Sequence, residues 1–212
     1  AGVTAVAAAD LFITKGKISS KFSKNGKSFI KEMSDDIDNV LKKDEYATKG
    51  RFEAFMSVPG LHAVWNHRLI HKLHEKNVPV LPRFLQNVSR FFTGIEIHPG
   101  AELGKNVFID HTGAIIGETA KVGNDVTITG HVVLGSTGKG HEFLRHTVVE
   151  DGASLGMNSV MLGRINIGKN AKVGAGTIVT HDVPANSTVI GNPAKIIAQN
   201  GKKLNNPIPL NS

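Results

Sequence analysis

The side chains best suited to chemistry lie from residue 98 onward, where histidines and an arginine gather. Imidazole is the natural general base near neutral pH, and the planar guanidinium of arginine matches a carboxylate. The residues in question are His98, His111, His131, His141, Arg145 and His146. Three histidines converging on one point would instead suit zinc. No spacing among these histidines fits such a site, so we predict no metal.

A Gly-rich segment carries three of these residues. It reads Gly-Ser-Thr-Gly-Lys-Gly-His-Glu-Phe-Leu-Arg-His over 135–146 and is rich in groups able to hold anions. The segment also interrupts a regular repeat, because the spacing from Leu134 to Val149 exceeds two repeats by three residues. Binding and catalytic residues concentrate on loops that a rigid scaffold carries. We therefore predict a functional loop over 135–147.

The scaffold is predicted from a six-residue period. Apart from that gap and one seven-residue step, aliphatic side chains recur every six residues, and small residues often follow them. The members are Ile97, Leu103, Ile109, Ile116, Val122, Ile128, Leu134, Val149, Leu155, Met161, Ile167, Val173 and Val179. Hexapeptide repeats are typical of a parallel β-helix, in which three repeats form one triangular coil and the aliphatic residues stack inside.

The first half has helical periodicity instead. Residues 29–43 place apolar side chains at three- and four-residue steps, and a second helix is predicted after the Pro-Gly pair at 59–60. A third apolar stripe runs over 81–92 and ends at Gly94. We predict that this stripe is buried in the core; it forms an interface only if the helices bury more than one face.

The predicted fold class is therefore α+β, with an N-terminal α-helical domain followed by a parallel β-helix. The boundaries are 1–27 for a flexible arm, 28–94 for the helical domain, 95–197 for the β-helix and 198–212 for a C-terminal tail. The 212 residues include no cysteine, and no apolar run approaches the roughly 20 residues that span a bilayer. The formal charge of +7 includes lysines gathered in the arm, which we interpret as a solvated segment. We expect neither membrane nor nucleic acid as a partner.

Several motifs resemble one enzyme family. They are Pro59–Trp65, Gly94–Ala101, Ile109–His111, Ile116–Ala120, Arg145-His146 and Gly191–Lys195. Together they resemble serine O-acetyltransferase, and the likeness runs from about residue 33 to residue 197. The resemblance implies left-handed coils and transfer of acetyl from acetyl-CoA to L-serine, giving O-acetylserine for cysteine biosynthesis. It also implies a cytoplasmic homotrimer, or a dimer of trimers, with the active site between neighbouring copies.

The resemblance assigns the catalytic pair. His111 matches the general base, and Glu96 matches the carboxylate that orients it. The repeat makes this pairing plausible, because Glu96 precedes Ile97 and His111 lies two residues past Ile109, on neighbouring levels of adjacent coils. Without the resemblance, a corner histidine bonded to backbone is the stronger interpretation of His111.

The acceptor site is implied in the same way. Arg145 and His146 match residues that hold the amino-acid carboxylate, and Asp110 matches the residue that holds the ammonium group. Asp44, or alternatively Glu45, aligns with an acidic residue contributed by the helical domain. A solvated acid at a helix end explains this position equally well.

The resemblance also implies the coenzyme A contacts. Ser136 matches a position whose backbone N–H faces the thioester oxygen, and Thr137 follows it. Ala175 and Gly176 match a pair that lines the pantetheine arm, and Lys195 matches a position near the nucleotide phosphates. Ordinary corner packing and a solvated lysine are the alternatives.

Departures from the family pattern keep other functions open. The stretch 110–117 is one residue shorter than in the family pattern, and the loop is about one residue longer. Met157-Asn158 replaces a pair of small residues. These differences are compatible with a homoserine acceptor or with a divergent serine enzyme. A sugar or antibiotic acetyltransferase, a γ-class carbonic anhydrase and a non-catalytic scaffold are further alternatives. The tail 206–212 lacks the terminal isoleucine with which many relatives bind O-acetylserine sulfhydrylase, so we do not expect that partner.

Overall fold

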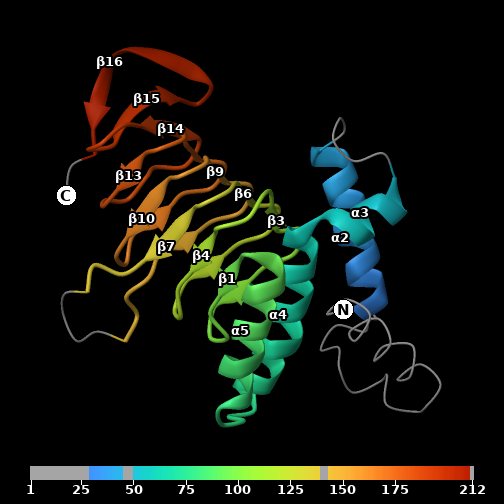
Figure 1. Ribbon diagram of the computed structural model, residues 1–212. Helices are drawn as coiled ribbons and strands as arrows, with labels where there is room; N and C mark the ends of the chain where they lie inside the picture. The colour runs from blue at the N-terminus through green and yellow to red at the C-terminus, as the bar shows by residue number, and fades with distance from the viewer. Residues whose placement is uncertain (1–28, 45–49, 139–142, 211–212) are drawn as a thin grey trace.

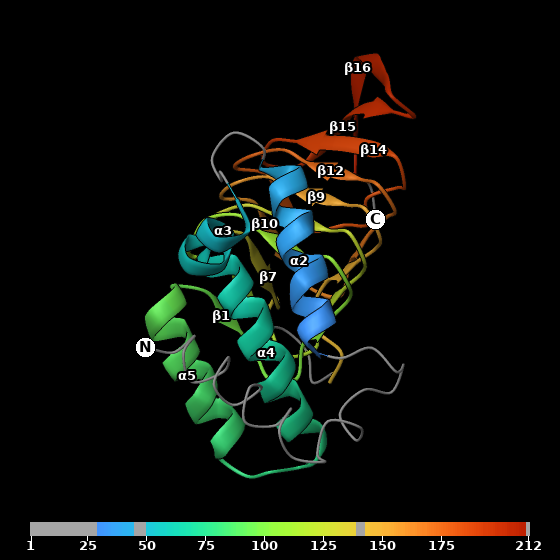
Figure 2. The same cartoon turned by 90° about the vertical axis from the view of Figure 1, so that its right-hand side faces the viewer.

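The computed structural model describes residues 29–44, 50–138 and 143–210. The predicted arm over 1–27 and His141 lie outside the described residues. In the described part, four helices come first: α2 (Phe29–Lys43), α3 (Arg51–Ser57), α4 (Pro59–Glu75) and α5 (Leu81–Thr93). None of them is long and apolar enough to cross a membrane. Figure 1 shows the helices beside the first coils of a stack of strands, and Figure 2 shows α2 and α4 on one flank of the stack.

The strands form the three faces of a prism, which we call sheets A, B and C. Sheet A contains β1 (Glu96–Ile97), β4 (Ile115–Ile116), β7 (Val133–Gly135), β10 (Val160–Leu162) and β13 (Ile178–Val179). Sheet B contains β2 (Glu102–Leu103), β5 (Lys121–Val122), β8 (Val148–Val149) and β11 (Asn166–Ile167). Sheet C contains β3 (Phe108–Ile109), β6 (Thr127–Ile128), β9 (Ser154–Leu155), β12 (Lys172–Val173), β14 (Ser187–Ile190), β15 (Lys195–Gln199) and β16 (Lys202–Pro209). All pairs are parallel except β14–β15 and β15–β16.

The core of the prism is the predicted aliphatic column. Every member of that column is buried except Leu103, which is partly buried. A second buried column lies two residues earlier in many repeats and is built of smaller side chains, such as Ala101, Ala120 and Ala171. The six-residue pattern did not reveal this column, because small residues are common at the corners of a tight coil as well as inside it.

The prism has two edges that matter for function. The C–A edge consists of the turns 110–114, 129–132, 156–159 and 174–177, which join strands of sheet C to strands of sheet A. The A–B edge consists of the turns 98–101, 117–120, 136–147, of which 136–138 and 143–147 are described, and 163–165. Successive turns of one edge are bonded to each other, as where the His131 N–H donates to the Thr112 carbonyl at 3.1 Å.

Helix α4 is fixed against the first coil by very close packing. A Cβ placed on Gly60 would lie 1.9 Å from the carbonyl oxygen of Ile109, so only glycine fits there. The imidazoles of His67 and His71 contact the carbonyls of Ala101 and Pro99 at 3.1 and 2.8 Å. Burial lowers the pKa of His67 to about 3, so this ring is neutral at physiological pH. The helical domain therefore docks on the turn that begins the β-helix.

A buried polar cluster joins α4 to α2. The indole of Trp65 donates to Asp36 at 3.0 Å, and Arg68 donates to the same carboxylate at 2.5 and 3.2 Å. A buried carboxylate is tolerated only when its oxygens are satisfied in this way. The Pro-Gly-Leu-His-Ala-Val-Trp segment is thus explained by packing, through Gly60 and Trp65.

The prediction that the stripe of α5 is core was wrong for the single chain. Phe84, Phe91 and Phe92 are 60%, 83% and 57% exposed. The helix packs against the rest of the protein through its other face, where Gln86 is buried and Ser89 accepts a hydrogen bond from Asn66. An amphipathic stripe indicates that one face becomes buried, but it does not reveal which partner buries it.

Candidate active site

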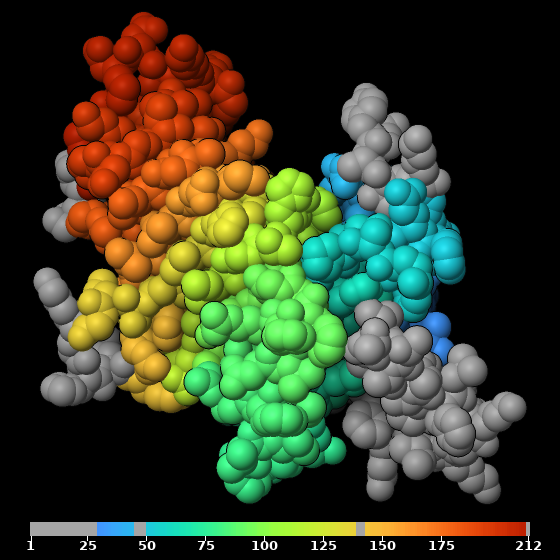
Figure 3. Space-filling model, in the orientation of Figure 1, coloured from blue at the N-terminus to red at the C-terminus, as the bar shows by residue number. Residues whose placement is uncertain are grey.

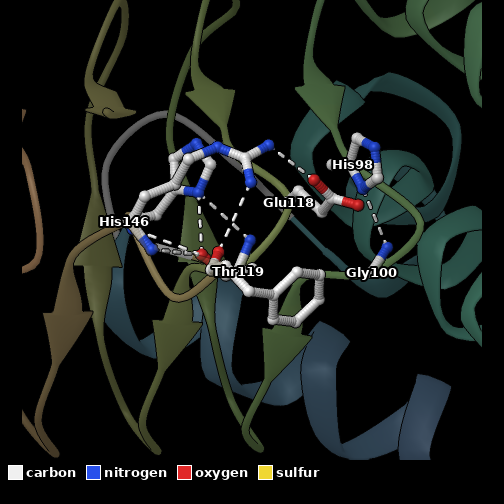
Figure 4. Close-up of polar contacts among 7 residues, drawn as sticks. His98, Gly100, Glu118, Thr119 and His146 are labelled. Atoms are coloured by element: carbon white, nitrogen blue, oxygen red, sulfur yellow. Dashed lines mark hydrogen bonds and ion pairs between the residues drawn. The ribbon is translucent and has the colours of Figure 1, made fainter. Parts of the chain in front are cut away.

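The A–B edge gathers a connected group of polar side chains. The guanidinium of Arg145 donates to the Glu118 carboxylate at 2.6 Å. The Nδ1 atom of His146 lies 3.2 Å from the backbone N of Thr119 and 2.9 Å from its hydroxyl oxygen. Figure 4 shows His146 beside Thr119, and His98 beside Glu118. The turn 117–120 therefore holds both residues of the Arg-His pair.

The charges at this edge affect one another. Burial tends to raise the pKa of the Glu118 carboxyl, but the hydrogen bond from Arg145 and the nearby His98 bring the pKa below its ordinary value. Burial lowers the pKa of His146, and the positive charge of Arg145 lowers it further. This group thus combines the Glu118 carboxylate, the Arg145 guanidinium and the neutral imidazole of His146.

His98 lies at the start of the same edge. Its Nδ1 accepts a hydrogen bond from the Gly100 N–H at 3.0 Å, which leaves the proton of the neutral ring on Nε2. Burial lowers the pKa of His98 to about 4, and Arg83 contributes to the shift. The ring is therefore a hydrogen-bond donor near neutral pH.

The C–A edge carries the other predicted residues. His111 has a left-handed backbone, with φ of 68°, and its side chain is 64% exposed. Its Nδ1 lies 2.9 Å from the Asp110 carboxylate. The predicted partner, Glu96, is instead 2.9 Å from the Arg90 guanidinium at the end of α5. In the described part of the chain, no hydrogen bond or ion pair joins Glu96 to His111, although the two lie on adjacent coils at neighbouring positions.

Known proteins resemble this chain over most of its length. The family model for the hexapeptide repeat of succinyl-transferase matches residues 146–181. The serine acetyltransferase of Bacillus subtilis is 46% identical over 177 residues, which cover 83% of this chain and 81% of that protein. The serine acetyltransferase of Staphylococcus xylosus is 42% identical over the same number of residues. The chain belongs to the serine acetyltransferase family.

Solved structures of the family agree with the fold. The Neisseria gonorrhoeae serine acetyltransferase in complex with serine is 38% identical, with a TM-score of 0.73 over 79% of this chain and 68% of that chain. The soybean serine acetyltransferase complexed with serine is 36% identical, with a TM-score of 0.76 over 80% and 69% of the two chains. The predicted fold, a helical domain followed by the left-handed parallel β-helix of the serine acetyltransferases, is confirmed. As a member of this family, the chain is an acyltransferase.

The predicted coenzyme A residues are divided between the two edges. Ser136 and Thr137 begin the turn 136–147 of the A–B edge. Ala175 and Gly176 are exposed in the last turn of the C–A edge, so they follow the same edge as His111. Lys195 is exposed at the start of β15. The loop leaves the prism between β7 and β8, and Figure 3 shows its described ends, in yellow, standing off the surface.

Asp44 lies beside sheet C. It directly follows α2, and the preceding Lys43 donates to the Thr127 hydroxyl at 3.0 Å and to the Asp125 carbonyl at 3.1 Å. Glu45 lies outside the described residues. The residue before Asp44 is therefore anchored at the start of β6.

The predicted site residues form two groups in one chain. From Thr112 to Glu118 the chain crosses sheet A through strand β4. Reacting groups must come within about 3–3.5 Å of each other. Because the C–A and A–B edges lie at opposite ends of the strands of sheet A, the sheet separates the His111 group from the Arg145 group within one chain.

Sequence reasoning missed Glu118 and Thr119. Both follow Ile116-Gly117 in a segment already noted for its resemblance, yet neither was predicted as a site residue. A signal was present, since the matching positions of two other A–B turns carry Pro99-Gly100 and Gly163-Arg164, without a carboxylate or a hydroxyl. Their role depends on where the chain returns after the loop, because Arg145 and His146 then contact them. The spacing of residues alone did not reveal this position.

Proposed function

We propose that the chain transfers the acetyl group of acetyl-CoA to the hydroxyl of L-serine, with His111 as general base. The observation that carries this proposal is the 2.9 Å contact between His111 Nδ1 and the Asp110 carboxylate. A neutral imidazole that donates from Nδ1 has an unprotonated Nε2, which is the atom that accepts a proton. Two solved relatives, from Neisseria gonorrhoeae and soybean, are complexes with serine.

The reaction then proceeds by direct attack. The serine hydroxyl oxygen bonds to the thioester carbonyl carbon while Nε2 of His111 takes the hydroxyl proton. The tetrahedral intermediate breaks its carbon–sulfur bond, and the proton passes from His111 to the leaving thiolate. The products are O-acetylserine and coenzyme A, with no covalent intermediate on the protein. Asp110 stabilises the imidazolium formed during the step, as the third member of a triad does.

The other histidines near the site are less suited to be the base. His98 and His146 each accept a backbone N–H at Nδ1, so each neutral ring carries its proton on Nε2. The pKa of each is lowered, mainly by burial. His111 combines an exposed ring with a carboxylate at Nδ1.

The acceptor is held by charges of both signs. Arg145 and His146 bind the serine carboxylate, and the second oxygen of Asp110 binds the ammonium group. Arg145 suits this role because its planar fork can bond two oxygens. The pairing of Glu96 with His111 stays a prediction. The ion pair of Glu96 with Arg90 is partly exposed, and such pairs are weak enough to exchange partners.

Coenzyme A is held along both edges. The backbone N–H of Ser136 donates to the developing oxyanion, which is the form of electrostatic stabilisation that contributes most to acyl transfer. Thr137 follows it on the A–B edge, and Ala175 and Gly176 line the pantetheine arm. Lys195 binds the nucleotide phosphates.

A complete site needs two copies of the chain. In a closed ring, the C–A edge of one copy faces the A–B edge of the next, so that His111 and Arg145 from different copies meet. The outer row of sheet A supports such an interface, because it is apolar at Ile115, Val133, Val160 and Ile178. Helix α5, which carries the exposed phenylalanines, adjoins β1 at the end of this row. We propose a homotrimer, which can pair into a dimer of trimers.

Release of free thiol from acetyl-CoA tests the proposed reaction. The assay compares L-serine, L-homoserine and a simple sugar, and a thiol-reactive disulfide reports the product. We expect saturable release with L-serine. A single methylene changes the specificity of an apolar pocket by roughly 10–200-fold, so homoserine is the sensitive comparison. A higher rate with homoserine would identify homoserine, and not serine, as the acceptor. Absence of thiol release with every acceptor would contradict acetyl transfer.

A further inference from the structure

The Thr119 hydroxyl uses its whole hydrogen-bonding capacity. It accepts from the backbone N–H groups of Arg145 and His146 at 3.1 and 3.2 Å. It also lies 2.9 Å from the Nδ1 atom of His146. A hydroxyl has one proton and two acceptor positions. Because two of its neighbours are donors, its proton can point only to Nδ1.

This arrangement determines the tautomer of His146. Nδ1 receives the Thr119 hydroxyl proton and, at 3.2 Å, the Thr119 backbone N–H. A nitrogen that accepts both has no proton of its own, so the neutral ring carries its proton on Nε2. Burial also lowers the pKa of His146, which keeps the ring neutral.

The ring is fixed in space as well. A Cβ on Gly117 would lie 2.1 Å from Cδ2 and 2.3 Å from Nε2 of His146, so the imidazole occupies the volume that a side chain at Gly117 would need. His146 is only 8% exposed. The neighbouring Arg145 is held separately, by Glu118 at 2.6 Å.

We propose that Thr119 is a positioning residue that fixes His146 as a hydrogen-bond donor and ties the Arg145-His146 backbone to the A–B edge. Nε2–H and the guanidinium then donate to the same kind of ligand, a carboxylate or another anionic oxygen. His146 is thereby prevented from competing with His111 as a base. This inference rests on the proposed function for the identity of the ligand, whereas the tautomer does not depend on it.

Nitrogen-15 NMR of the histidine rings tests the tautomer without any substrate. The signals of His146 are assigned by comparison with His146→Gln. We expect an unprotonated Nδ1 and a protonated Nε2 in the intact protein at neutral pH. A protonated Nδ1 would overturn the proposal. Because no turnover is measured, this result is independent of whether the protein acetylates serine.

Two variants separate positioning from folding. Thr119→Val keeps the shape but removes the hydroxyl, so we expect the His146 signals to change and the KM for L-serine to rise roughly tenfold or more, with a smaller change in kcat. Thr119→Ser keeps the hydroxyl and should restore the His146 signals and KM. If Thr119→Val lowered only the melting temperature and left both KM and the His146 signals unchanged, Thr119 would be structural and the proposal would fail.

Discussion

Replacing His111 with alanine will lower kcat for serine acetylation by about 10²–10⁴-fold, the usual contribution of a general base. The KM for acetyl-CoA should change little, because the base acts on the acceptor hydroxyl. Steady-state kinetics measure both quantities. The folded structure should survive, since the side chain is exposed.

His131→Ala is the matched control for this variant. His131 lies one coil further along the same C–A edge, has a similar left-handed φ of 59° and is also exposed. We expect its kcat to stay close to that of the unmodified protein. Equal losses in both variants would indicate that any histidine of this edge matters only for structure, and full activity of His111→Ala would exclude His111 as the base.

Gly60→Ala will destabilise the protein and reduce kcat. The new methyl would lie 1.9 Å from the Ile109 carbonyl oxygen and 2.9 Å from its carbon, so α4 or β3 must move. Overpacking of this kind typically costs about 1–3 kcal/mol. Because Ile109 directly precedes Asp110 and His111, the displacement reaches the base. Denaturant unfolding and steady-state kinetics measure the two effects.

The sign of the change in unfolding free energy of Gly60→Ala distinguishes an effect of packing from an effect of helix propensity. In an unhindered helix, replacing glycine with alanine stabilises by about 1 kcal/mol. Glu75→Ala, at the exposed end of α4, introduces alanine without a steric clash and should have little effect. A stabilised Gly60→Ala protein with normal kcat would show that the contact between α4 and β3 does not position His111.

The sequence was most informative where a short period repeats many times. The aliphatic column from Ile97 to Val179 predicted the prism, because one slip in thirteen positions leaves little ambiguity in register. The bounds of α2 were also predicted, since a 15-residue amphipathic stripe has clear ends. Helix α3 has only seven residues and was missed, because so short a segment shows barely two helical turns.

The candidate site was less predictable than the fold. The resemblance named Arg145 and His146, and it did not reveal that the turn 117–120 holds them. The ion pairs of Glu96 with Arg90 and of His111 with Asp110 depend on side-chain directions, which spacing does not determine. The prediction for the apolar stripe of α5 was wrong for a similar reason, because a single sequence does not show whether a partner chain covers an apolar face.

Complementation between two inactive variants tests most directly whether one site is built from two copies. His111→Ala and Arg145→Ala chains with different tags are refolded together, and mixed oligomers are isolated by both tags. In a ring of three, every mixed oligomer contains one site with both residues intact, so we expect about a third of the unmodified activity. Mixed oligomers as inactive as either parent would show that His111 and Arg145 must act from the same chain, and would contradict the account.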